Sequence, residues 1–588
     1  MDYFLAEVSY EAGNKVGGIW TVITSKSSTI KNLFGEDYLA IGFYNPSQAA
    51  IEIVESDPPD FILNAINETG MDRSIFHFGN WIQANNLNLL LIDSKKFENN
   101  KINDIRTEFW EKFKIDSLNS PGDYNEPLAW SYLVGVFIAA LSKYTKKKVV
   151  CQAHEWLSAG AVLYLKANKV AVPTVFTIHA TVLGRAISYS GGDTINFISS
   201  NSQVPADMPY KYGVAAKHFT EKAGAMNATV FTAVSDTVAD EAEVILEKKP
   251  DIITINGIDI KNLPTIDEVN SIKRGALEKL NTFLSAYFLP YYDVDFTNAP
   301  IFFTSGRYEF YDKGFDLFID ALGMLDKLLP EGKNLLAIIT VPAGTIGPKN
   351  EVVANYLTYL SIQSQISRDV KSFDEAALTL PTNKLSNIDK IYSKILMDAK
   401  MMIKELRRPR PTNPPLCPFV LSYPESNDAI ISELNKVGLQ NSQSNKVKVI
   451  FYPKYLVVGD ELLNLTYNEL LSTVTSGFFL SKYEPFGYTP LECASYLSIS
   501  FTTSNSGFGR YIQKLKLTER GIFAEDIEGS GKDEAVKKVA LDMLQLTNLD
   551  QDDLFNMKTL ARKTAEIFDW ENLISNYLKA YELSLNKT

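Results

Sequence analysis

The chain has 588 residues, of which 45% are apolar and 22% are charged, and its formal net charge is -12. This length predicts two large domains or three ordinary ones, and the composition is that of a globular protein rather than a disordered one. The acidic balance argues against a nucleic-acid partner, because binding to a phosphate backbone depends on clustered cations.

Neither a disulfide framework nor a membrane segment is expected. The three cysteines, Cys151, Cys417 and Cys493, are far apart and share no metal-ligand spacing, which fits a reducing compartment. The N-terminal residues include no basic segment followed by a long apolar run. The most apolar stretch, 132–141, is shorter than the roughly 20 residues that a membrane helix needs. We therefore expect a cytoplasmic protein with no membrane partner.

Short apolar runs alternate with longer helical patterns in the first part of the chain. This alternation predicts βαβ units, and the apolar character of many runs predicts parallel strands that are buried on both faces. The fold class is therefore α/β, with a doubly wound sheet. The first set of strands is predicted at 3–8, 89–92, 149–153, 174–178, 229–234 and 252–255.

A second set of strands follows a helical stretch at about 262–288. We place a domain boundary after it, with domains over 1–290 and 291–560. Two such Rossmann-like domains would enclose a central cleft and bind ligands at the carboxyl ends of their strands. The second set is predicted at 301–305, 335–341, 447–452, 477–480 and 499–503.

The second domain contains a helical insertion at 345–412, in which we see no clear strand. Ile388, Ile395 and Leu406 belong to one apolar stripe in this insertion. An apolar stripe without a sheet to cover it predicts self-association, and packing of the stripe on its own domain is the alternative.

The first candidate site is the segment 14–18, between the first predicted strand and a helical pattern. It places Gly17 and Gly18 beside Lys15. Paired glycines let backbone amides approach an anion, and a helix N-terminus favours that anion. A tight turn between strand and helix is the alternative explanation.

Histidines follow two of the predicted strands. His154 comes directly after 149–153, and His179, which begins the segment 179–185, comes directly after 174–178. The chain has only four histidines, and a doubly wound sheet places its site at such strand ends. Both histidines are therefore candidate site residues, although a purely structural role is the alternative.

The loop 306–314 follows the predicted strand 301–305 and carries Arg307 and Lys313. Arginine supplies a bidentate fork and lysine a point charge, so the two side chains could grip a diphosphate from two sides. A diphosphate leaving group needs such neutralisation, from cations or from a metal. A solvated loop is the alternative.

The most specific motif is 483–492, which holds the carboxylates Glu484 and Glu492. Thr489 is predicted to cap a helix, and Glu492 to complete a capping box. The start of the same helix would offer free amides to a phosphate. Glu484 lies before the helix and has no capping role, so it is the stronger catalytic candidate. The amides in question belong to Gly487, Tyr488 and Thr489.

At these motifs the chain resembles the eukaryotic-type glycogen synthase family of retaining glycosyltransferases with the GT-B fold. The resemblance implies transfer of glucose from a sugar nucleotide to the end of an α-glucan, with the α configuration kept. It also implies that residues 561–588 form a C-terminal helix that returns to the N-terminal domain. The matching segments are 11–19, 153–157, 179–185, 249–257, 306–309 and 483–490.

The resemblance implies a role for each candidate residue. Arg307 and Lys313 would hold the donor diphosphate, and Glu484 would act at the transferred glucose. Glu492 would meet the ribose or the loop that holds it, and Tyr467 matches the position that stacks on uracil. The implied cleft residues of the N-terminal domain are His179 and Arg185.

The resemblance also implies the partners. The donor would be UDP-glucose, with ADP-glucose as the alternative, and the acceptor an α-glucan; the oligomer would be a tetramer. Asp293 and Asp295 are spaced like the Asp-x-Asp site of metal-dependent glycosyltransferases, but they precede a predicted strand instead of following one. With Arg307 and Lys313 available for the phosphates, we expect no metal and no other cofactor.

One segment departs from the animal and fungal members. Their arginine-rich helix binds glucose 6-phosphate, whereas 556–566 keeps only Lys558, Arg562 and Lys563. We interpret the pair Lys558 and Arg562 as a solvated helix surface, and we expect little or no activation by glucose 6-phosphate. The alternatives to a glycogen synthase are another retaining GT-B enzyme, an inactive glycan-binding homologue and a glucan phosphorylase.

Overall fold

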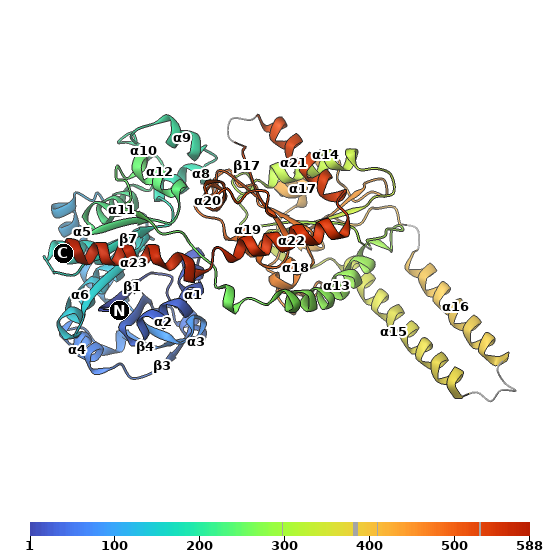
Figure 1. Cartoon of the computed structure of the whole chain (residues 1–588), viewed down its shortest axis with the longest axis horizontal. Helices are drawn as coiled ribbons and strands as arrows, with labels where there is room; N and C mark the ends of the chain where they lie inside the picture. Colours follow the sequence, from blue (N-terminus) through green and yellow to red (C-terminus); the bar gives the residue numbers. More distant parts are fainter. Residues whose placement is uncertain (297, 380–385, 408–409, 528–530) are drawn as a thin grey trace.

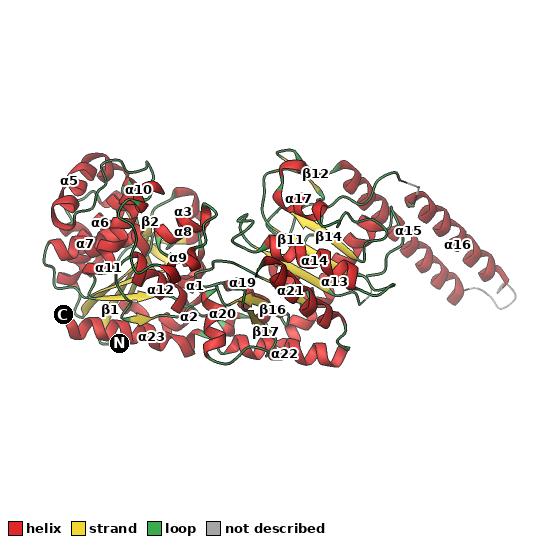
Figure 2. Ribbon diagram, turned by 90° about the horizontal axis from the view of Figure 1, so that it is seen from above, coloured by secondary structure: helices red, strands yellow, loops and turns green. Residues whose placement is uncertain are grey.

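The computed structural model describes residues 1–588 except 297, 380–385, 408–409 and 528–530. Two α/β units lie side by side, and a pair of helices projects from the second unit (Figure 1). Parallel strands cannot be joined by tight turns, so each returns through a helix that covers one face of the sheet. Figure 2 shows these helices around both sheets.

The first unit is built on a nine-stranded sheet within the described residues. The pairs β3–β4 and β4–β5 are antiparallel, and the other pairs are parallel. Most of its strands are almost fully buried. In spatial order the strands are β3 (Ile53–Glu55), β4 (Phe76–Trp81), β5 (Leu87–Ile92), β2 (Tyr38–Phe43), β1 (Tyr3–Val8), β6 (Lys148–His154), β7 (Thr174–Ile178), β8 (Val230–Ala233) and β9 (Ile252–Ile253).

The helices of the first unit connect these strands and pack on the sheet. The N-terminal ends of several are capped by side chains, for example Thr181 at α8 and Ser235 at α12. In chain order they are α1 (Gly18–Ser25), α2 (Ser27–Phe34), α3 (Pro46–Glu52), α4 (Asp60–Glu68), α5 (Lys95–Phe113), α6 (Asn125–Tyr144), α7 (Glu155–Ala167), α8 (Val182–Tyr189), α9 (Thr194–Ser200), α10 (Met208–Lys211), α11 (Ala215–Asn227) and α12 (Asp236–Ile245).

The second unit is built on a six-stranded, wholly parallel sheet within the described residues. In spatial order its strands are β14 (Val447–Tyr452), β11 (Leu335–Thr340), β10 (Ile301–Ser305), β15 (Ser476–Phe478), β16 (Ile499–Thr503) and β17 (Ile522–Glu525). The helices around it are α13 (Ile266–Phe288), α14 (Phe315–Leu328), α17 (Ala429–Lys436), α18 (Tyr467–Thr473), α19 (Tyr488–Ser495), α20 (Gly507–Lys514), α21 (Lys532–Thr547) and α22 (Gln551–Glu566).

The predicted insertion is a helical hairpin with a small sheet at its base. Helices α15 (Asn350–Thr379) and α16 (Ser386–Leu406) run side by side away from the second unit (Figure 1). The expectation of no strand here is wrong, because β12 (Thr345–Pro348) pairs antiparallel with β13 (Phe419–Leu421). Glycine and proline within β12 hide it from a propensity-based prediction.

The C-terminal segment forms two helices where the sequence predicted one over 561–588. Helix α22 stays with the second unit, and α23 (Trp570–Lys587) lies against the first sheet (Figure 1). The chain breaks between them because Asp569 caps the new helix by accepting a hydrogen bond from the Glu571 amide at 2.7 Å. Trp570 then anchors α23 by donating to Ser25 Oγ at 2.8 Å.

Candidate active site

Loops at the carboxyl ends of both sheets meet between the two units. Ser235 at the start of α12 donates to the Pro485 carbonyl at 2.6 Å. A Cβ on Gly507 would lie 2.3 Å from that same carbonyl oxygen and 2.5 Å from Ser235 Cβ. Only glycine fits at 507, so the loop that contains Glu484 packs directly on the first unit.

Two ion pairs join helices α12 and α20 beside this contact. Arg510 pairs with Asp240 at 2.7 Å and Lys514 with Asp236 at 3.0 Å. All four side chains are at least one-fifth exposed, so each pair contributes little stability on its own. Their role is to fix how α12 of the first unit and α20 of the second unit sit against each other.

Lys313 and Glu484 form an ion pair between the two loops of the second unit that the sequence singled out. Gly314 is in the left-handed region (φ 67°), and a Cβ there would lie 1.9 Å from the Leu480 carbonyl oxygen. The backbone of the 306–314 loop therefore lies directly against the chain after β15. This close approach brings Lys313 to Glu484.

Arg307 is the most exposed of the candidate residues in the second unit. Its side chain is 71% exposed and pairs with Glu309 at 3.1 Å. The stem of Lys313 lies beside the neighbouring glycine, because a Cβ on Gly306 would be 3.5 Å from Lys313 Cγ. The two cations thus lie at one strand end, and Arg307 is free to move toward an anion.

The predicted cap of α19 is wrong. Gly487 (φ 99°) is the N-cap residue, and no side chain of the described residues caps this helix. Thr489 lies inside the helix, so Glu492 completes no capping box. The reason is that glycine at the left-handed position starts the helix two residues earlier, at Tyr488.

Glu492 does not cap α19 but faces Tyr467 and Lys15. Burial raises the pKa of Glu492 to about 7, while Tyr467 and the charge of Lys15 partly offset this rise. Tyr467 also lies 3.4 Å from Ser305 Oγ, at the end of β10. The structure thus brings Lys15 of the first unit and Tyr467 of the second unit to the same carboxylate.

The amide of Gly17 is already bound in this structure. Glu11 Oε2 accepts hydrogen bonds from Gly17 N at 3.0 Å and from Trp20 N at 2.9 Å. A carboxylate therefore occupies the position that the sequence assigned to a bound anion. Gly18 has open space around it, and Lys15 Nζ lies 4.4 Å from the Trp20 ring.

His179 and His154 form a hydrogen-bonded pair at the ends of β7 and β6. The register pairs His154 with Thr177, so His179 lies just beyond the end of the sheet. His154 Nδ1 lies 2.9 Å from His179 Nε2, and His154 Nε2 lies 2.8 Å from Glu7 Oε1. Burial lowers the pKa of both rings, that of His179 well below its usual range, so both are neutral.

Arg185 lies in α8 and pairs with Glu155 at 2.8 Å. Glu155 has a positive φ of 57°, which is unusual for a residue other than glycine. Its carboxylate is 8% exposed, whereas the Arg185 side chain is 48% exposed. A strained backbone position thus supplies a buried carboxylate that holds a half-exposed guanidinium.

Glu241 connects the two sides of the site. It accepts a hydrogen bond from the Thr181 amide at 2.7 Å and one from the Tyr483 hydroxyl at 2.9 Å. Thr181 caps the helix of Arg185, and Tyr483 precedes Glu484. Through one buried carboxylate, the structure links the Arg185 helix to the Glu484 loop.

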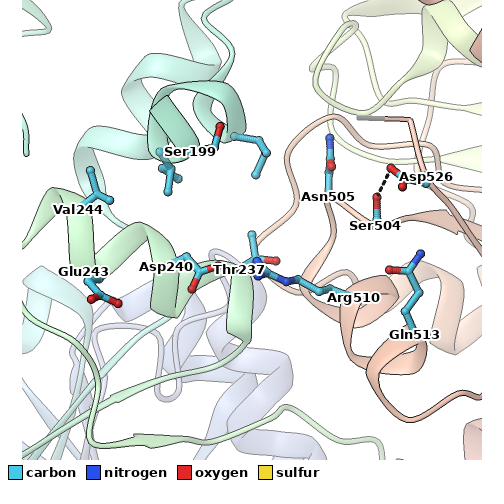
Figure 3. Close-up of a pocket in the computed structure, with 12 residues that line it drawn as sticks. Ser199, Thr237, Asp240, Glu243, Val244, Ser504, Asn505, Arg510, Gln513 and Asp526 are labelled. Atoms are coloured by element: carbon cyan, nitrogen blue, oxygen red, sulfur yellow. Dashed lines mark hydrogen bonds and ion pairs between the residues drawn. The ribbon is translucent and has the colours of Figure 1, made fainter. Parts of the chain in front are cut away.

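A cavity of about 530 Å³ is lined by residues of both units (Figure 3). Its lining includes three carboxylates, Asp240, Glu243 and Asp526, and one guanidinium, Arg510, which is paired with Asp240. The excess of negative charge in this lining would repel a diphosphate. No candidate donor-binding residue lines this cavity, so we base the donor site on the strand-end loops instead.

Asp293, the first residue of the Asp-x-Asp spacing, takes part in an ion pair. Asp293 pairs with Arg407 at 2.5 Å, near the base of the hairpin. Across the described part of the chain, no cluster of three or more His, Cys, Asp or Glu side chains could hold a metal ion. Nor does any helix of the described residues have the length and apolar character needed to cross a membrane.

The interpretation of Lys558 and Arg562 as a solvated pair is wrong. Lys558 is 8% exposed and donates to the Val474 carbonyl at 2.7 Å. Arg562 is 4% exposed and donates to the Ser495 carbonyl at 2.5 Å. Helix α22 packs on α19 and β16, so its cations satisfy buried carbonyls instead of facing water.

Sequence reasoning missed the buried carboxylates Glu7, Glu155 and Glu241. Glu7 lies in the apolar strand β1, and a carboxylate in a run that is buried on both faces must be paired. That signal was available in the sequence. The partners of Glu155 and Glu241 come from distant segments and carry no local signal.

The comparisons with known proteins agree with the GT-B fold class. The sequence model of the family described as "Glycogen synthase" matches residues 7–588. Glycogen [starch] synthase isoform 2 of Saccharomyces cerevisiae is 30% identical, over 100% of this chain and 86% of the yeast protein. The enzyme of Neurospora crassa is 29% identical, over 100% and 84%. The liver enzyme of Homo sapiens is 28% identical, also over 100% and 84%.

Two solved structures share the fold at low sequence identity. The catalytic domain of starch synthase IV from Arabidopsis thaliana, bound to ADP and acarbose, has a TM-score of 0.50 at 14% identity, with 100% of both chains covered. An α,α-trehalose 6-phosphate synthase from Burkholderia multivorans has a TM-score of 0.50 at 9% identity, with 100% of this chain and 99% of that chain covered.

Proposed function

This chain belongs to the glycogen synthase family, and we propose that it transfers glucose from UDP-glucose to the non-reducing end of an α-1,4-glucan. It is a glucosyltransferase of the glycogen and starch synthase type. The observation that carries the proposal is the Lys313–Glu484 ion pair. It joins the two strand-end loops of the second unit, and the adjacent Tyr483 is linked through Glu241 to the helix of Arg185 in the first unit.

Each wall of the cleft has its own task in this proposal. Arg307 and Lys313 bind the diphosphate and neutralise the charge that develops on it as it leaves. Glu484 stabilises and orients the glucose at the reacting carbon. The bond from that carbon to the diphosphate oxygen breaks, a bond to the acceptor hydroxyl forms on the same face, and the leaving phosphate takes the acceptor proton. The α configuration is then kept without a covalent intermediate.

We assign the base of the nucleoside to the ring of Tyr467 and its ribose to Glu492. An aromatic ring offers a face on which a base can stack, and a carboxylate accepts hydrogen bonds from ribose hydroxyls. Lys15 lies close enough to Glu492 to affect its pKa, so the first unit reaches the donor site when the two units are together. ADP-glucose is the alternative donor, because none of these contacts reads the base edge.

We also propose that transfer needs no metal and that the protein acts in the cytoplasm. Arg307 and Lys313 supply the positive charge that a metal would otherwise bring. The three cysteines are free and buried, which suits a reducing compartment. Transfer in excess EDTA should equal transfer without it, and a strict need for a divalent cation would overturn the diphosphate assignment.

Product analysis tests the reaction. Glucose labelled in the donor should enter glycogen, and an exo-acting enzyme that removes maltose from non-reducing ends should release the label. Folded Glu484→Gln protein serves as the matched control. A labelled disaccharide as sole product would support another retaining GT-B enzyme, whereas glycogen binding without turnover would support an inactive homologue.

Self-association through the α15–α16 hairpin is the second part of the proposal, with a tetramer as the expected state. The predicted stripe needs one correction. Ile395 is half-buried and Leu406 is 5% exposed, as expected of a stripe that faces α15 and the base; the side chain of Ile388 lies outside the described residues. The exposed apolar side chains of the described part of the hairpin are Leu357, Val370, Leu378, Tyr392, Leu396, Met397, Met401 and Ile403.

Light scattering on two matched variants tests this surface. Met397 is 63% exposed, and Lys394 is an exposed neighbour on the same helix. Met397→Asp should reduce the molar mass of the oligomer, because a desolvated carboxylate opposes apolar contact, while Lys394→Asp should not. An oligomer of unchanged mass in Met397→Asp would show that the hairpin does not form the interface.

A further inference from the structure

A buried charged network lies beneath the first unit's side of the cleft. Glu7 in β1 is 0% exposed and has three donors, one from the junction of α1 and α2, one from β2 and one from β6. Lys26 Nζ lies 2.5 Å from Glu7 Oε1, the Tyr38 hydroxyl donates to Oε2 at 2.7 Å, and His154 Nε2 lies 2.8 Å from Oε1. His179 joins the network through His154 and is 7% exposed.

The donors around Glu7 fix its charge. Burial alone would raise the pKa of this carboxyl, but Lys26 and His154 hold the pKa well below its usual range. An ionised carboxylate only accepts hydrogen bonds. Since Glu7 cannot donate, the hydrogen on the contact between His154 and Glu7 must belong to His154 Nε2.

The same reasoning assigns the hydrogen that lies between the rings of His154 and His179. A neutral imidazole carries one N–H donor and one acceptor nitrogen, and burial keeps His154 neutral. With its hydrogen on Nε2, His154 presents an unprotonated Nδ1. That atom lies 2.9 Å from His179 Nε2, so His179 Nε2 must be the donor. The Nδ1 of neutral His179 is then an acceptor.

We propose that Glu7 and His154 are positioning residues that hold His179 as the Nε2–H tautomer, with its Nδ1 lone pair offered to a hydroxyl in the cleft. This rests on the proposed function, in which His179 is a residue of the first unit's side of the cleft, where the sugar substrates bind. Phosphate oxygens at neutral pH only accept hydrogen bonds, so such a nitrogen cannot bind the diphosphate. The first unit thereby selects sugar hydroxyls, and the cations of the second unit take the phosphates.

A network that only stabilised the fold would not need this arrangement. Lys26 and Tyr38 already give Glu7 one charged and one neutral partner. His218, also buried, provides a contrast: its Nδ1 has no hydrogen-bond partner within the described structure. His154 instead uses both nitrogens, one toward a carboxylate and one toward a strand-end residue. Such a chain fixes the tautomer and orientation of its last ring.

Nitrogen NMR on protein with ¹⁵N-labelled histidine tests the tautomer directly. The chain has four histidines, so the signals can be assigned by single substitutions. His77→Asn is the matched control, because His77 contacts Glu55 and Tyr44 and has no part in the Glu7 network, so its loss should leave the His179 signal unchanged. Substrate-free wild-type protein should show His179 protonated at Nε2 alone. A wild-type His179 protonated at Nδ1 would overturn the proposal.

Two substitutions of His154 connect the tautomer to turnover. Glutamine can donate to Glu7 and accept from His179, whereas phenylalanine can do neither. Loss of the group that orients a functional imidazole costs about 10- to 100-fold at metal-bound imidazoles, so kcat of folded His154→Phe should fall by about that factor. KM for the donor should change by less than about threefold, because the lost contact is not to the donor. His154→Gln should keep most of the activity.

The outcomes separate this proposal from the proposed function. Folded His154→Phe with an unchanged His179 signal and unchanged kcat would overturn the proposal while leaving the glucosyltransferase assignment intact. If His154→Phe does not fold, the wild-type NMR result decides alone, since it needs neither substrate nor activity. Failure of wild-type protein to transfer glucose would instead contradict the proposed function, whatever the tautomer.

Discussion

The two walls of the cleft hold their functional side chains in different ways. On the first unit, His179 is backed by His154 and Glu7, and all three are at least nine-tenths buried. On the second unit, Arg307 is 71% exposed, and Lys313 is bound to the catalytic candidate Glu484 itself. One wall is fixed before substrate arrives, whereas the other must exchange its ion pairs.

This difference matches what each wall has to bind. Neutral hydroxyls are recognised by hydrogen bonds of fixed direction, and buried partners can hold that direction. A diphosphate brings several negative charges, which cations on loops can meet by moving. When a diphosphate enters, Lys313 is expected to turn from Glu484 toward the phosphates, and this exchange would free the carboxylate at the reacting centre.

Glu484→Gln should reduce kcat by about 10² to 10³, because one preorganised electrostatic contact to a developing charge is worth that much. Folding should be preserved, since the side chain is at a loop and its main pairing is to Lys313. Steady-state kinetics with circular dichroism as the folding control would check this. Near-normal turnover by folded protein would remove Glu484 from the chemistry and leave the second wall without a catalytic group.

Arg307→Ala and Lys313→Ala should each lower kcat/KM for the donor by about 10- to 100-fold, which corresponds to one hydrogen bond to a charged group. The melting temperature should change little, because both residues are on a strand-end loop. Lys436, an exposed cation paired with Glu433 on α17, provides the control Lys436→Ala. Unchanged donor kinetics in both site variants would place the diphosphate elsewhere.

Glu492 belongs to the second unit, yet burial raises its pKa. It therefore tests whether burial governs a side chain's behaviour on either wall of the cleft. Its folded pKa of about 7 lies above the ordinary value of 4.5, so the folded state binds the proton more tightly. The free energy of unfolding should therefore fall as pH rises from about 4.5 through 7, by up to about 3 kcal/mol. Denaturant titrations at several pH values should show this fall, and Glu492→Gln should lack it. An equal pH dependence in both proteins would contradict the assignment.

Helix α22 provides a third case, in which buried cations donate to backbone carbonyls of the protein itself. Arg562→Ala should lower the free energy of unfolding by about 2 kcal/mol, because it leaves the buried Ser495 carbonyl without its charged donor. Millimolar glucose 6-phosphate should change the activity of the wild type little, since Lys558 and Arg562 already bind backbone carbonyls. A several-fold stimulation that is lost in Arg562→Ala would contradict this account.

The sequence was sufficient for the fold class and for the strand-end motifs. Apolar runs alternating with helical patterns predicted the parallel sheets, and Arg307, Lys313 and Glu484 were found because each follows a strand. Local rules failed where a close packing contact decided the outcome. Gly487 starts α19 two residues before the predicted cap, and glycine and proline hid β12.

Long-range pairing was the other obstacle. From the sequence, the cations of α22 were interpreted as a solvated face. Their partners are the carbonyls of Val474 and Ser495, which lie far away in the sequence. Glu241 joins the two walls through Thr181 and Tyr483, and no spacing in the chain indicates that link. Helical periodicity predicted an apolar stripe in the insertion but could not tell which of its members would be covered: Leu406 is buried, whereas Tyr392 and Ile403 are exposed.

The most direct test of the account is a transfer assay with UDP-glucose and ADP-glucose side by side, each with glycogen and excess EDTA. The account predicts label in the polymer from at least one of the two donors, with UDP-glucose as the proposed one. Glu484→Gln should incorporate at least about 10²-fold less label. Absence of polymer-bound label from both donors in the wild type, or label found only in a small product, would contradict it.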